Sequence, residues 1–538
     1  MIFHNNAGVY PYDSKRTVTY ARNGVVAASQ PLASQAGLDI LKKGGNAVDA
    51  AIAAAAALTV VEPTSNGIGG DAFAIVWIKN ELHGLNASGP APSDISIEKL
   101  KGEGLTEIPE FGFVPVTVPG VPAAWAELSR AFGELPYEEL FRPAIQYAEQ
   151  GYPLSPILAQ FWDKGVKAYR KKLKGEEFQS WFDTFAPDGR APSAGEVWQS
   201  QAHADTLKSI AASFSRDFYE GDLADQIDKF SRRYGGYLSK KDLMKFQPEW
   251  VKPVSVNYKG YDVWEIPPNG QGMIALQALN MMKSLEIGGR DDVKTLHHQI
   301  EAMKLAFADG MNYITDPDKM TISLYDLLSE QYAAVRSRDI GEHALQPKPG
   351  SPPKGGTVYL AAADKQGNMI SFIQSNYMGF GSGLVVPGTG IALQNRGHNF
   401  SMNPGHVNAL EGGKRTFHTI IPGFITKGNE AVGPFGVMGG FMQPQGHLQV
   451  IMNMVDFGLN PQAALDAPRW QWLKDKTVAA ESSFHPAVLK QLADKGHHIQ
   501  MEYETGSFGR GQIICRNPAN GVYAAGTESR TDGSISAW

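Results

Sequence analysis

The most informative stretch of the sequence is Gly355-Gly356-Thr357-Val358-Tyr359-Leu360-Ala361-Ala362-Ala363-Asp364. A Pro-rich segment leads into its two glycines, with prolines at Pro347, Pro349, Pro352 and Pro353. A strand is predicted to begin at Thr357 and to end at the turn sequence Asp364-Lys365-Gln366-Gly367-Asn368. A second strand is predicted over Met369-Ile370-Ser371-Phe372-Ile373-Gln374-Ser375. The stretch therefore predicts a β-hairpin whose first residue, behind two glycines, carries a hydroxyl group.

The chemistry of this hairpin would change if the Gly356–Thr357 bond were cut. Thr357 would then carry a free α-amine beside its own hydroxyl, and the reference pKa of an α-amine is about 7.7–8.0. Such an amine can accept the hydroxyl proton without help from a histidine or an aspartate. Glycine before the bond permits the backbone conformations that self-cleavage needs. On these residues alone two interpretations stay open, an N-terminal nucleophile or a linker that precedes an edge hairpin.

Length and composition limit the classes of protein to consider. The 538 residues allow one large domain or about two to four average ones. Lys and Arg number 49 against 55 Asp and Glu, and no run of charge indicates nucleic acid or an anionic membrane as a partner. The single cysteine, Cys515, excludes an internal disulfide and a cysteine-rich metal site, and its apolar neighbours predict a buried structural thiol.

Neither a secretion signal nor a membrane span is predicted. The first residues, Met1-Ile2-Phe3-His4-Asn5-Asn6, contain no apolar signal core. The longest apolar run, from Ala50 to Val61, is shorter than the about 20 residues that a span requires. We therefore expect a soluble protein located in the cytoplasm.

The first third of the chain predicts both strands and helices. A strand pair is expected within residues 17–30, then helices over Pro31–Lys43 and Asn46–Val60. The second helix is apolar all round and rich in alanine, which is typical of a helix buried on several sides. Residues 155–250 are mostly helical and more charged, which suggests outer layers.

Two motifs resemble known binding sites but lack the required spacing. The turn Gly67-Ile68-Gly69-Gly70 lacks the lysine and hydroxyl of a phosphate-binding loop, so nucleotide binding is not expected. His297-His298-x-x-Glu301 is not the H-E-x-x-H pattern of a zinc enzyme. We interpret it as the surface of a helix and expect no metal.

Long segments of the N-terminal half are very similar to the γ-glutamyltransferase family of N-terminal-nucleophile hydrolases, which includes glutathione hydrolases and some cephalosporin acylases. The similar segments are Gly44-Gly45-Asn46-Ala47-Val48-Asp49-Ala50-Ala51, Glu62-Pro63, Gly67-Ile68-Gly69-Gly70-Asp71, residues 116–133, Asp217-Phe218-Tyr219-Glu220-Gly221 and Pro267-Pro268-Asn269-Gly270-Gln271-Gly272. The stretch around Thr357 resembles the processing site of this family. The resemblance covers nearly the whole chain.

The resemblance implies a fold and a reaction. It implies an α+β protein, a single four-layer αββα sandwich over residues 1–538, cut between Gly356 and Thr357 into a large subunit (1–356) and a small subunit (357–538). The reaction would be acyl transfer from an amide through an acyl-enzyme on Thr357, with water, an amino acid or a peptide as acceptor. No metal or organic cofactor is implied. Two copies of the processed protein could form a further homodimer.

Residues that follow the nucleophile match the family only in part. In the family a hydroxyl at the position of Ser375 hydrogen-bonds the nucleophile, and the second strand of the hairpin would bring it there. Tyr377 stands where the family usually has asparagine, and a phenol can still donate a hydrogen bond to substrate. The carboxylate that grips the substrate α-amine is replaced by Asn399, and Arg396 stands where transferases carry a smaller polar group. Arg396 is then either a surface residue or a two-pronged grip for a carboxylate.

Further family positions also differ. The family's arginine for the substrate α-carboxylate would fall near Ser88, in Leu85-Asn86-Ala87-Ser88-Gly89-Pro90-Ala91-Pro92, and is absent. The family's pair of hydroxyl residues that binds a carboxylate is here His418 and Thr419, and His418 as a general base is an alternative that the α-amine makes unnecessary. The segment from Ser401 to Lys414 is too short for a long lid, which suggests an open pocket.

A glycine pair completes the predicted machinery. Gly436-Val437-Met438-Gly439-Gly440 is similar to the family's oxyanion segment, in which two backbone N–H groups would face the developing negative charge. Three functions remain under consideration: a γ-glutamyl hydrolase or transferase, an acylase that prefers glutaryl-type amides, or an inactive family member that acts as a binding or scaffold protein. The changes at Ser88 and Asn399 favour the acylase, because a glutaryl group has no α-amine.

Overall fold

The computed structural model describes residues 15–347 and 356–538, and it confirms the predicted hairpin. Strands β10 (Gly356–Asp364) and β11 (Met369–Tyr377) pair antiparallel, with Tyr359 opposite Ile373. The register shifts between Gly356 and Val358, so that an irregularity falls at Thr357. The prolines at 349, 352 and 353 and Gly355 lie outside the described residues.

The hairpin forms the centre of a seven-stranded sheet, here called the hairpin sheet. Its strand order is β19-β2-β10-β11-β3-β4-β7. Besides the hairpin it contains β19 (Ser534–Ala537), β2 (Gly24–Ala28), β3 (Asp71–Ile78), β4 (Glu81–Ala87) and β7 (Glu249–Val251). Strands from the beginning, middle and end of the chain therefore lie side by side.

A second seven-stranded sheet, here called the glycine sheet, packs against the first. Its order is β1-β18-β17-β13-β12-β9-β8. Its strands are β1 (Thr19–Ala21), β18 (Tyr523–Thr527), β17 (Arg510–Arg516), β13 (Glu430–Met438), β12 (Gly423–Lys427), β9 (Tyr261–Glu265) and β8 (Val254–Tyr258). Two smaller sheets contain β14 (Trp470–Lys474), β15 (Thr477–Glu481) and β16 (His498–Glu502), and β5 (Tyr152–Pro153) and β6 (Val197–Trp198).

The predicted pairing of two strands within residues 17–30 is wrong, because β1 and β2 belong to different sheets. Tyr20 lies opposite Ala524, whereas Val26 lies opposite Ala362. All of β2 is buried, so it needs a neighbour on each side, and β10 and β19 supply them. Between β1 and β2 the backbone N–H groups of Arg22 and Asn23 donate to the carbonyl of Trp538 as the chain crosses from one sheet to the other.

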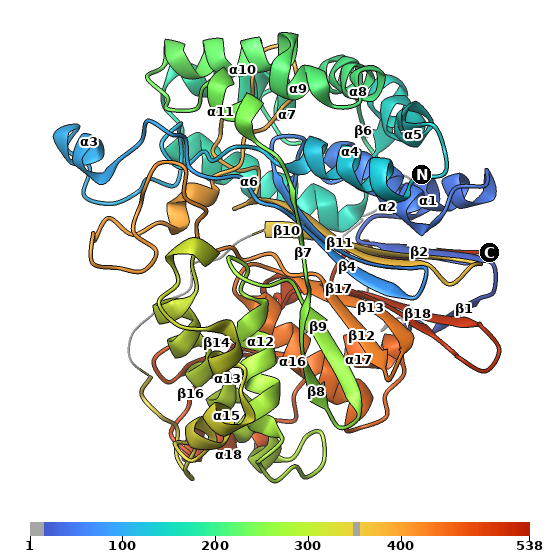
Figure 1. Cartoon of the computed structure of the whole chain (residues 1–538), viewed down its shortest axis with the longest axis vertical. Helices are drawn as coiled ribbons and strands as arrows, with labels where there is room; N and C mark the ends of the chain where they lie inside the picture. The colour runs from blue at the N-terminus through green and yellow to red at the C-terminus, as the bar shows by residue number, and fades with distance from the viewer. Residues whose placement is uncertain (1–14, 348–355) are drawn as a thin grey trace.

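Successive side chains of β10 alternate between the two faces of the hairpin sheet. Val358, Leu360 and Ala362 belong to the core under the helices, whereas Tyr359, Ala361 and Ala363 belong to the core between the sheets. Since successive side chains of a strand point to opposite faces and both faces of β10 are covered, the residues from Val358 to Ala363 are apolar at every position. The αββα sandwich is therefore confirmed, with a layer of helices on each outer face (Figure 1).

Helices of the first half cover the hairpin sheet. They are α1 (Pro31–Lys42), α2 (Ala47–Val61), α4 (Val121–Phe132), α5 (Tyr137–Gln150), α6 (Pro156–Lys172), α7 (Gln179–Phe185), α8 (Gln201–Ser213), α9 (Arg216–Glu220), α10 (Asp222–Arg233) and α11 (Lys240–Lys245), with α3 (Ile97–Gly102) at the periphery. The predicted helices are confirmed within about one residue, and α2 begins with a capping box between Asn46 and Asp49. All fifteen residues of α2 are buried, as its uniform apolar pattern predicts.

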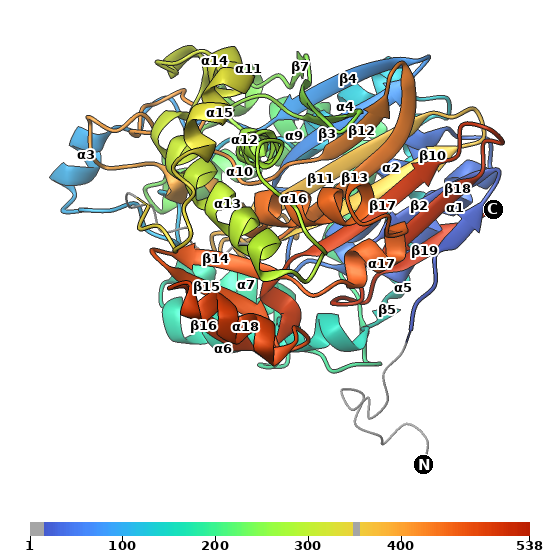
Figure 2. The ribbon, with the colours of Figure 1, turned by 90° about the horizontal axis from the view of Figure 1, so that it is seen from below.

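A second group of helices covers the glycine sheet, as the turned view shows (Figure 2). They are α12 (Gly272–Met282), α13 (Val293–Tyr313), α14 (Leu324–Leu327), α15 (Glu330–Ser337), α16 (Met442–Val455), α17 (Pro461–Asp466) and α18 (Pro486–Asp494). Among the described residues, no helix combines the length and the hydropathy that crossing a bilayer requires.

Candidate active site

Thr357, the second residue of β10, lies beside the hydroxyl group that the predicted hairpin would bring to it. Thr357 Oγ1 is 3.1 Å from Ser375 Oγ, and both residues are buried. The backbone N–H of Tyr377 donates to Ser375 Oγ at 2.8 Å, which fixes the position of that oxygen. The shift of register at Thr357 places it opposite the end of β11, where this backbone turn occurs. The hairpin therefore brings together two hydroxyl groups that are separated by eighteen residues.

Tyr377 combines a strained backbone with a buried ring. Its φ of 74° is in the left-handed region, which non-glycine residues rarely adopt outside constrained sites. Its hydroxyl donates to Asn399 Oδ1 at 2.6 Å. The guanidinium of Arg396 lies 4.5 Å from the centre of the ring, a cation–π contact. The phenol, the amide and the guanidinium thus form one wall close to Ser375.

Arg396 is a buried residue and not a surface arginine. Its side chain has no exposed area, and its Nε donates to Asp71 Oδ2 at 3.3 Å. Its Nη1 donates to the hydroxyl of Thr419 at 2.6 Å. Its Nη2 has no hydrogen-bond partner within the part of the chain that the structure describes. A buried N–H group without an acceptor is costly, so this nitrogen is suited to receive an anionic ligand.

Asp71 neutralises this arginine and also fixes His418. Asp71 is the first residue of β3 and lies opposite Ser375 in the sheet. His418 Nε2 lies 3.0 Å from Asp71 Oδ2, and the backbone N–H of Ile420 is directed at His418 Nδ1 at 3.4 Å. These contacts assign the ring proton to Nε2, so the imidazole donates to Asp71. Both ring nitrogens of His418 are thus engaged, one with Asp71 and one with Ile420. This arrangement does not favour His418 as the base for Thr357.

Burial, and then the charge of Arg396, lower the pKa of His418 to about 4. Between about pH 6.5 and pH 4 the unfolded chain binds a proton at this residue that the folded protein does not. The free energy of unfolding should therefore decrease on acidification through this window. In a His418→Asn variant the decrease should be smaller, by at most about 1.4 kcal/mol per pH unit. Urea titrations of both proteins from pH 7 to pH 4 measure the difference, and equal slopes would contradict the assignment.

The glycine pair lies in the turn between β13 and α16. Gly439 and Gly440 have φ values of 140° and 59°, where a side chain would be strained. Their carbonyls accept hydrogen bonds from Met442 and Gln443 at the start of α16. Among the described residues, neither glycine N–H takes part in the backbone hydrogen bonds formed outside helices and strands. This geometry leaves two N–H donors for a negative charge.

The side chain of Ser88 belongs to a neighbouring network of neutral amides. Its hydroxyl lies 2.7 Å from Asn86 Oδ1, and Asn269 Nδ2 donates to it at 3.2 Å. The backbone carbonyl of Asn269 in turn accepts from the N–H of His418 at 2.9 Å. Ser88 is therefore buried and hydrogen-bonded beside the site. Its hydroxyl contacts only neutral amides, whereas its backbone carbonyl accepts from Arg415 Nε at 3.0 Å.

Asp71, Gln271 and Gln443 also lie at the candidate site, although no role was predicted for them from the sequence. Gln271 Nε2 donates to the carbonyls of both Thr419 and Gly440, so it ties the glycine turn to the wall that contains Arg396. Gln443 lies beside Thr357. Asp71 follows the Gly-rich turn in a segment that is similar to the family, but that similarity alone assigns it no role. The positions of these polar side chains could not be predicted from local patterns, because each contacts a segment that is distant in the sequence.

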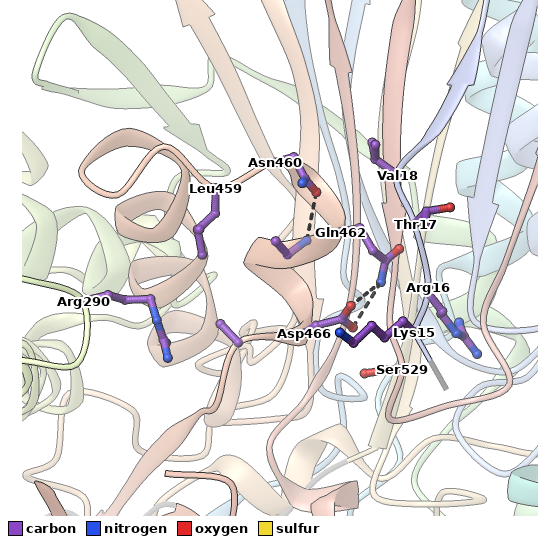
Figure 3. A pocket seen from close by; sticks show the side chains of 12 residues that line it. Lys15, Arg16, Thr17, Val18, Arg290, Leu459, Asn460, Gln462, Asp466 and Ser529 are labelled. Atoms are coloured by element: carbon purple, nitrogen blue, oxygen red, sulfur yellow. Dashed lines mark hydrogen bonds between the residues drawn. The ribbon is translucent and has the colours of Figure 1, made fainter. Parts of the chain in front are cut away.

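The candidate site is covered by other parts of the chain among the residues that the structure describes. Thr357 is 1% exposed, and Arg396, His418 and Thr419 are fully buried. A surface pocket of about 760 Å³ lies elsewhere, between residues near the N-terminus and α17 (Figure 3). It is lined by residues such as Lys15, Arg290 and Asp466, and by none of the predicted site residues.

The interpretation of His297 and Glu301 as a helix surface is wrong. Both are buried where α13 packs against α12, α16 and α18, and His297 Nδ1 lies 2.8 Å from His497 Nε2. The three side chains lie close enough to hold a metal ion. Lys304 Nζ, however, lies 2.6 Å from Glu301 Oε1 and already neutralises this carboxylate. We therefore interpret the cluster as a buried ion pair with two neutral histidines.

Comparisons with known proteins agree with this architecture. A family model described as gamma-glutamyltranspeptidase matches residues 33–538. The chain is 34% identical to the glutathione hydrolase-like YwrD proenzyme of Bacillus subtilis, over 95% of this chain and 97% of that protein. It is 32% identical to the oxamate amidohydrolase proenzyme of Klebsiella pneumoniae, over 96% and 98%. A crystal structure of cephalosporin acylase from Bacillus halodurans is similar with a TM-score of 0.96, at 61% identity over 99% and 98% of the two chains.

The αββα sandwich, with a hydroxyl residue near the start of a central strand, defines a protein of the N-terminal-nucleophile hydrolase class. The chain belongs to the gamma-glutamyltranspeptidase family. It is therefore an enzyme of amide chemistry, a hydrolase or acyltransferase formed from a proenzyme.

Proposed function

We propose that this enzyme cuts itself between Gly356 and Thr357 and then hydrolyses amides of short acids that carry a second carboxylate, with glutaryl amides as the model substrates. The observation that carries the proposal is the buried Arg396, whose Nη2 has no partner among the described residues. An acyl group with a free carboxylate would supply the missing acceptor. A neutral acyl group would leave that nitrogen unsatisfied.

The residues around Arg396 do not favour a γ-glutamyl group as the preferred acyl group. An α-amine would need a carboxylate, but this position holds the neutral Asn399, whose Oδ1 already accepts from Tyr377. The carboxylate nearest to Arg396 is Asp71, and Arg396 and His418 already occupy it. Two relatives are consistent with this choice, since cephalosporin acylase and oxamate amidohydrolase are named for other amides. Oxamate itself is an amide with a carboxylate and without an α-amine.

The reaction follows from the chemistry of the released Thr357. Its α-amine takes the proton of Oγ while Oγ attacks the amide carbonyl, and the carbonyl electrons move to oxygen, which faces the N–H groups of Gly439 and Gly440. The carbon–nitrogen bond then breaks, and the proton passes from the α-ammonium to the departing amine. Water attacks the ester that remains, and the carboxylic acid leaves as Thr357 recovers its proton. An amino acid or peptide can replace water as acceptor.

The test compares three anilides that release the same chromophore: glutaryl-, γ-glutamyl- and butyryl-p-nitroanilide. We expect the highest kcat/KM for the glutaryl compound, about 100-fold above the butyryl compound, because one charged hydrogen bond contributes about 1.5–3 kcal/mol. A γ-glutamyl compound that reacts faster than the glutaryl compound would contradict the substrate assignment and favour a glutathione hydrolase. Absence of turnover with all three by a cleaved enzyme would contradict the choice of acyl group.

Three other predictions from the sequence accompany this proposal. The two fragments, 1–356 and 357–538, are expected to stay together as subunits of one αββα domain. We also predict that the processed protein can form a homodimer and that it is located in the cytoplasm. The alternative of an inactive scaffold protein is disfavoured, because Thr357, Ser375 and the glycine pair are all present.

A further inference from the structure

Gln443 lies in the first turn of α16, three residues after Gly440, and its buried side chain is directed at the proposed nucleophile. Its Nε2 is 3.5 Å from Thr357 Oγ1. The residue has no exposed area, and its backbone N–H donates to the carbonyl of Gly440. The side chain is therefore held by the same turn as the two glycine N–H groups.

The orientation of the Gln443 amide is fixed by a second contact. The backbone N–H of Ile421 donates to Gln443 Oε1 at 2.9 Å. Since Ile421 supplies a donor, the atom that it meets must be the amide oxygen, and the NH₂ group must face Thr357. An amide NH₂ can only donate, so any hydrogen bond between these two side chains has Thr357 Oγ1 as acceptor.

We propose that Gln443 is a further catalytic residue, whose amide N–H donates to Thr357 Oγ and stabilises negative charge on that oxygen during acyl transfer. This inference rests on the proposed function of Thr357. The bond is long in the intact chain, where the nitrogen of Thr357 still belongs to the peptide bond with Gly356. Hydrogen bonds of catalytic groups often shorten only when the reacting complex forms.

The proposed role applies whenever Oγ gains or loses a bond to carbon. During attack, Oγ gives its proton to the α-amine and its electron pair forms the new carbon–oxygen bond, so charge builds on Oγ before the bond is complete. When the ester is hydrolysed, the carbon–oxygen bond breaks and Oγ keeps the electron pair until it takes a proton from the α-ammonium. Self-cleavage likewise requires Oγ to attack the carbonyl of Gly356. One donor can therefore affect all three steps.

Two substitutions separate this role from a structural one. Gln443→Glu keeps an oxygen acceptor for the N–H of Ile421 but loses the donor to Thr357. Gln443→Met loses both contacts without introducing a charge. The matched control is Gln449→Met, because Gln449 lies on the same helix, is buried, and bonds the backbone of Trp470 and Gln445 instead of Thr357.

The measurements are the rate of self-cleavage by intact mass, the pH profiles of kcat and KM for glutaryl-p-nitroanilide, and the melting temperature. Both Gln443 variants should cleave about 100-fold more slowly and lose about 100-fold in kcat, as for an oxyanion donor, with KM within about 3-fold. In Gln443→Glu the acid limb of the profile should move to higher pH, because a nearby carboxylate raises the pKa of the α-amine. In Gln443→Met this limb should stay in place. Gln449→Met should keep kcat within about 3-fold.

Two results would overturn the inference about Gln443 while leaving the function of Thr357 intact. One is a wild type that cleaves and turns over together with a Gln443→Met protein whose cleavage rate and kcat are within about 3-fold of it. The other is an equal loss of kcat in Gln443→Met and Gln449→Met, which would assign the effect to packing of α16. A wild type that neither cleaves nor turns over would instead reject the proposed function, and with it the role of Gln443.

Discussion

A Thr357→Ala protein is expected to remain a single chain and to hydrolyse no amide. Alanine has no oxygen to attack the carbonyl of Gly356, so the α-amine is never released. It also cannot form the acyl-enzyme, so no second route to turnover remains. The fold should persist, because the change removes the hydroxyl that contacts Ser375 Oγ at 3.1 Å but leaves the apolar residues of the hairpin in place. Denatured mass, taken fresh and after days of incubation, measures the cleavage.

Two variants control for damage to the hairpin. Thr357→Ser keeps the hydroxyl and should cleave and turn over. Ser371→Ala removes a hydroxyl from the same strand as Ser375, one that contacts Tyr359 at 2.8 Å, and should behave as wild type. In the wild type, two fragments should sum to the full chain, with the smaller one starting at Thr357. Turnover by Thr357→Ala at the wild-type rate would falsify the assignment of the nucleophile.

The second large effect is expected from Arg396→Gln. The substitution leaves Asp71 buried with His418 as its remaining side-chain partner, and breaking a buried ion pair typically costs about 3–5 kcal/mol of stability. It also removes the guanidinium group that is proposed to bind the carboxylate of the acyl group. The advantage of glutaryl- over butyryl-p-nitroanilide should therefore fall about 100-fold, mainly through the loss of the glutaryl reaction.

A double variant separates stability from specificity. Asp71→Asn with Arg396→Gln removes both charges, and it should be more stable than Arg396→Gln alone because no carboxylate remains uncompensated. Its preference for the glutaryl compound should still be lost. If Arg396→Gln kept the full preference, the carboxylate of the substrate would have to bind elsewhere. Chemical denaturation and the ratio of the two kcat/KM values are the measurements.

Local patterns predicted the centre of the molecule well. The turn sequence at Asp364 and the apolar runs on both sides fixed the hairpin, and its register then placed Ser375 beside Thr357. An all-apolar composition predicted α2 within one residue. These features depend on neighbours in the sequence, so a single chain contains enough information for them.

Features that depend on distant segments were missed or wrong. Arg396 meets Asp71 across 325 residues of sequence, and no local pattern shows that a charged residue in an irregular segment will be buried there. The same holds for Glu301. Its charge and that of Lys304 make the helix look partly polar in the sequence, but the two charges pair with each other and are buried. Strands β1 and β2 were paired with each other because they are adjacent in the chain, although β18 and β10 are their partners.

The order of strands decides what a cut at Gly356–Thr357 does to the molecule. In the hairpin sheet, β2 from the first fragment lies between β19 and β10 from the second. In the glycine sheet, β1 on one edge and β9 and β8 on the other come from the first fragment, and the strands between them come from the second. The two pieces are therefore woven together, and neither retains a complete sheet without the other. The intact chain is needed for the strands to pair once, after which ladder hydrogen bonds and the shared hydrophobic cores hold the two pieces together. A cleaved molecule that is fully denatured must find its partner by diffusion, so its recovery should depend on concentration, whereas that of the uncut chain should not.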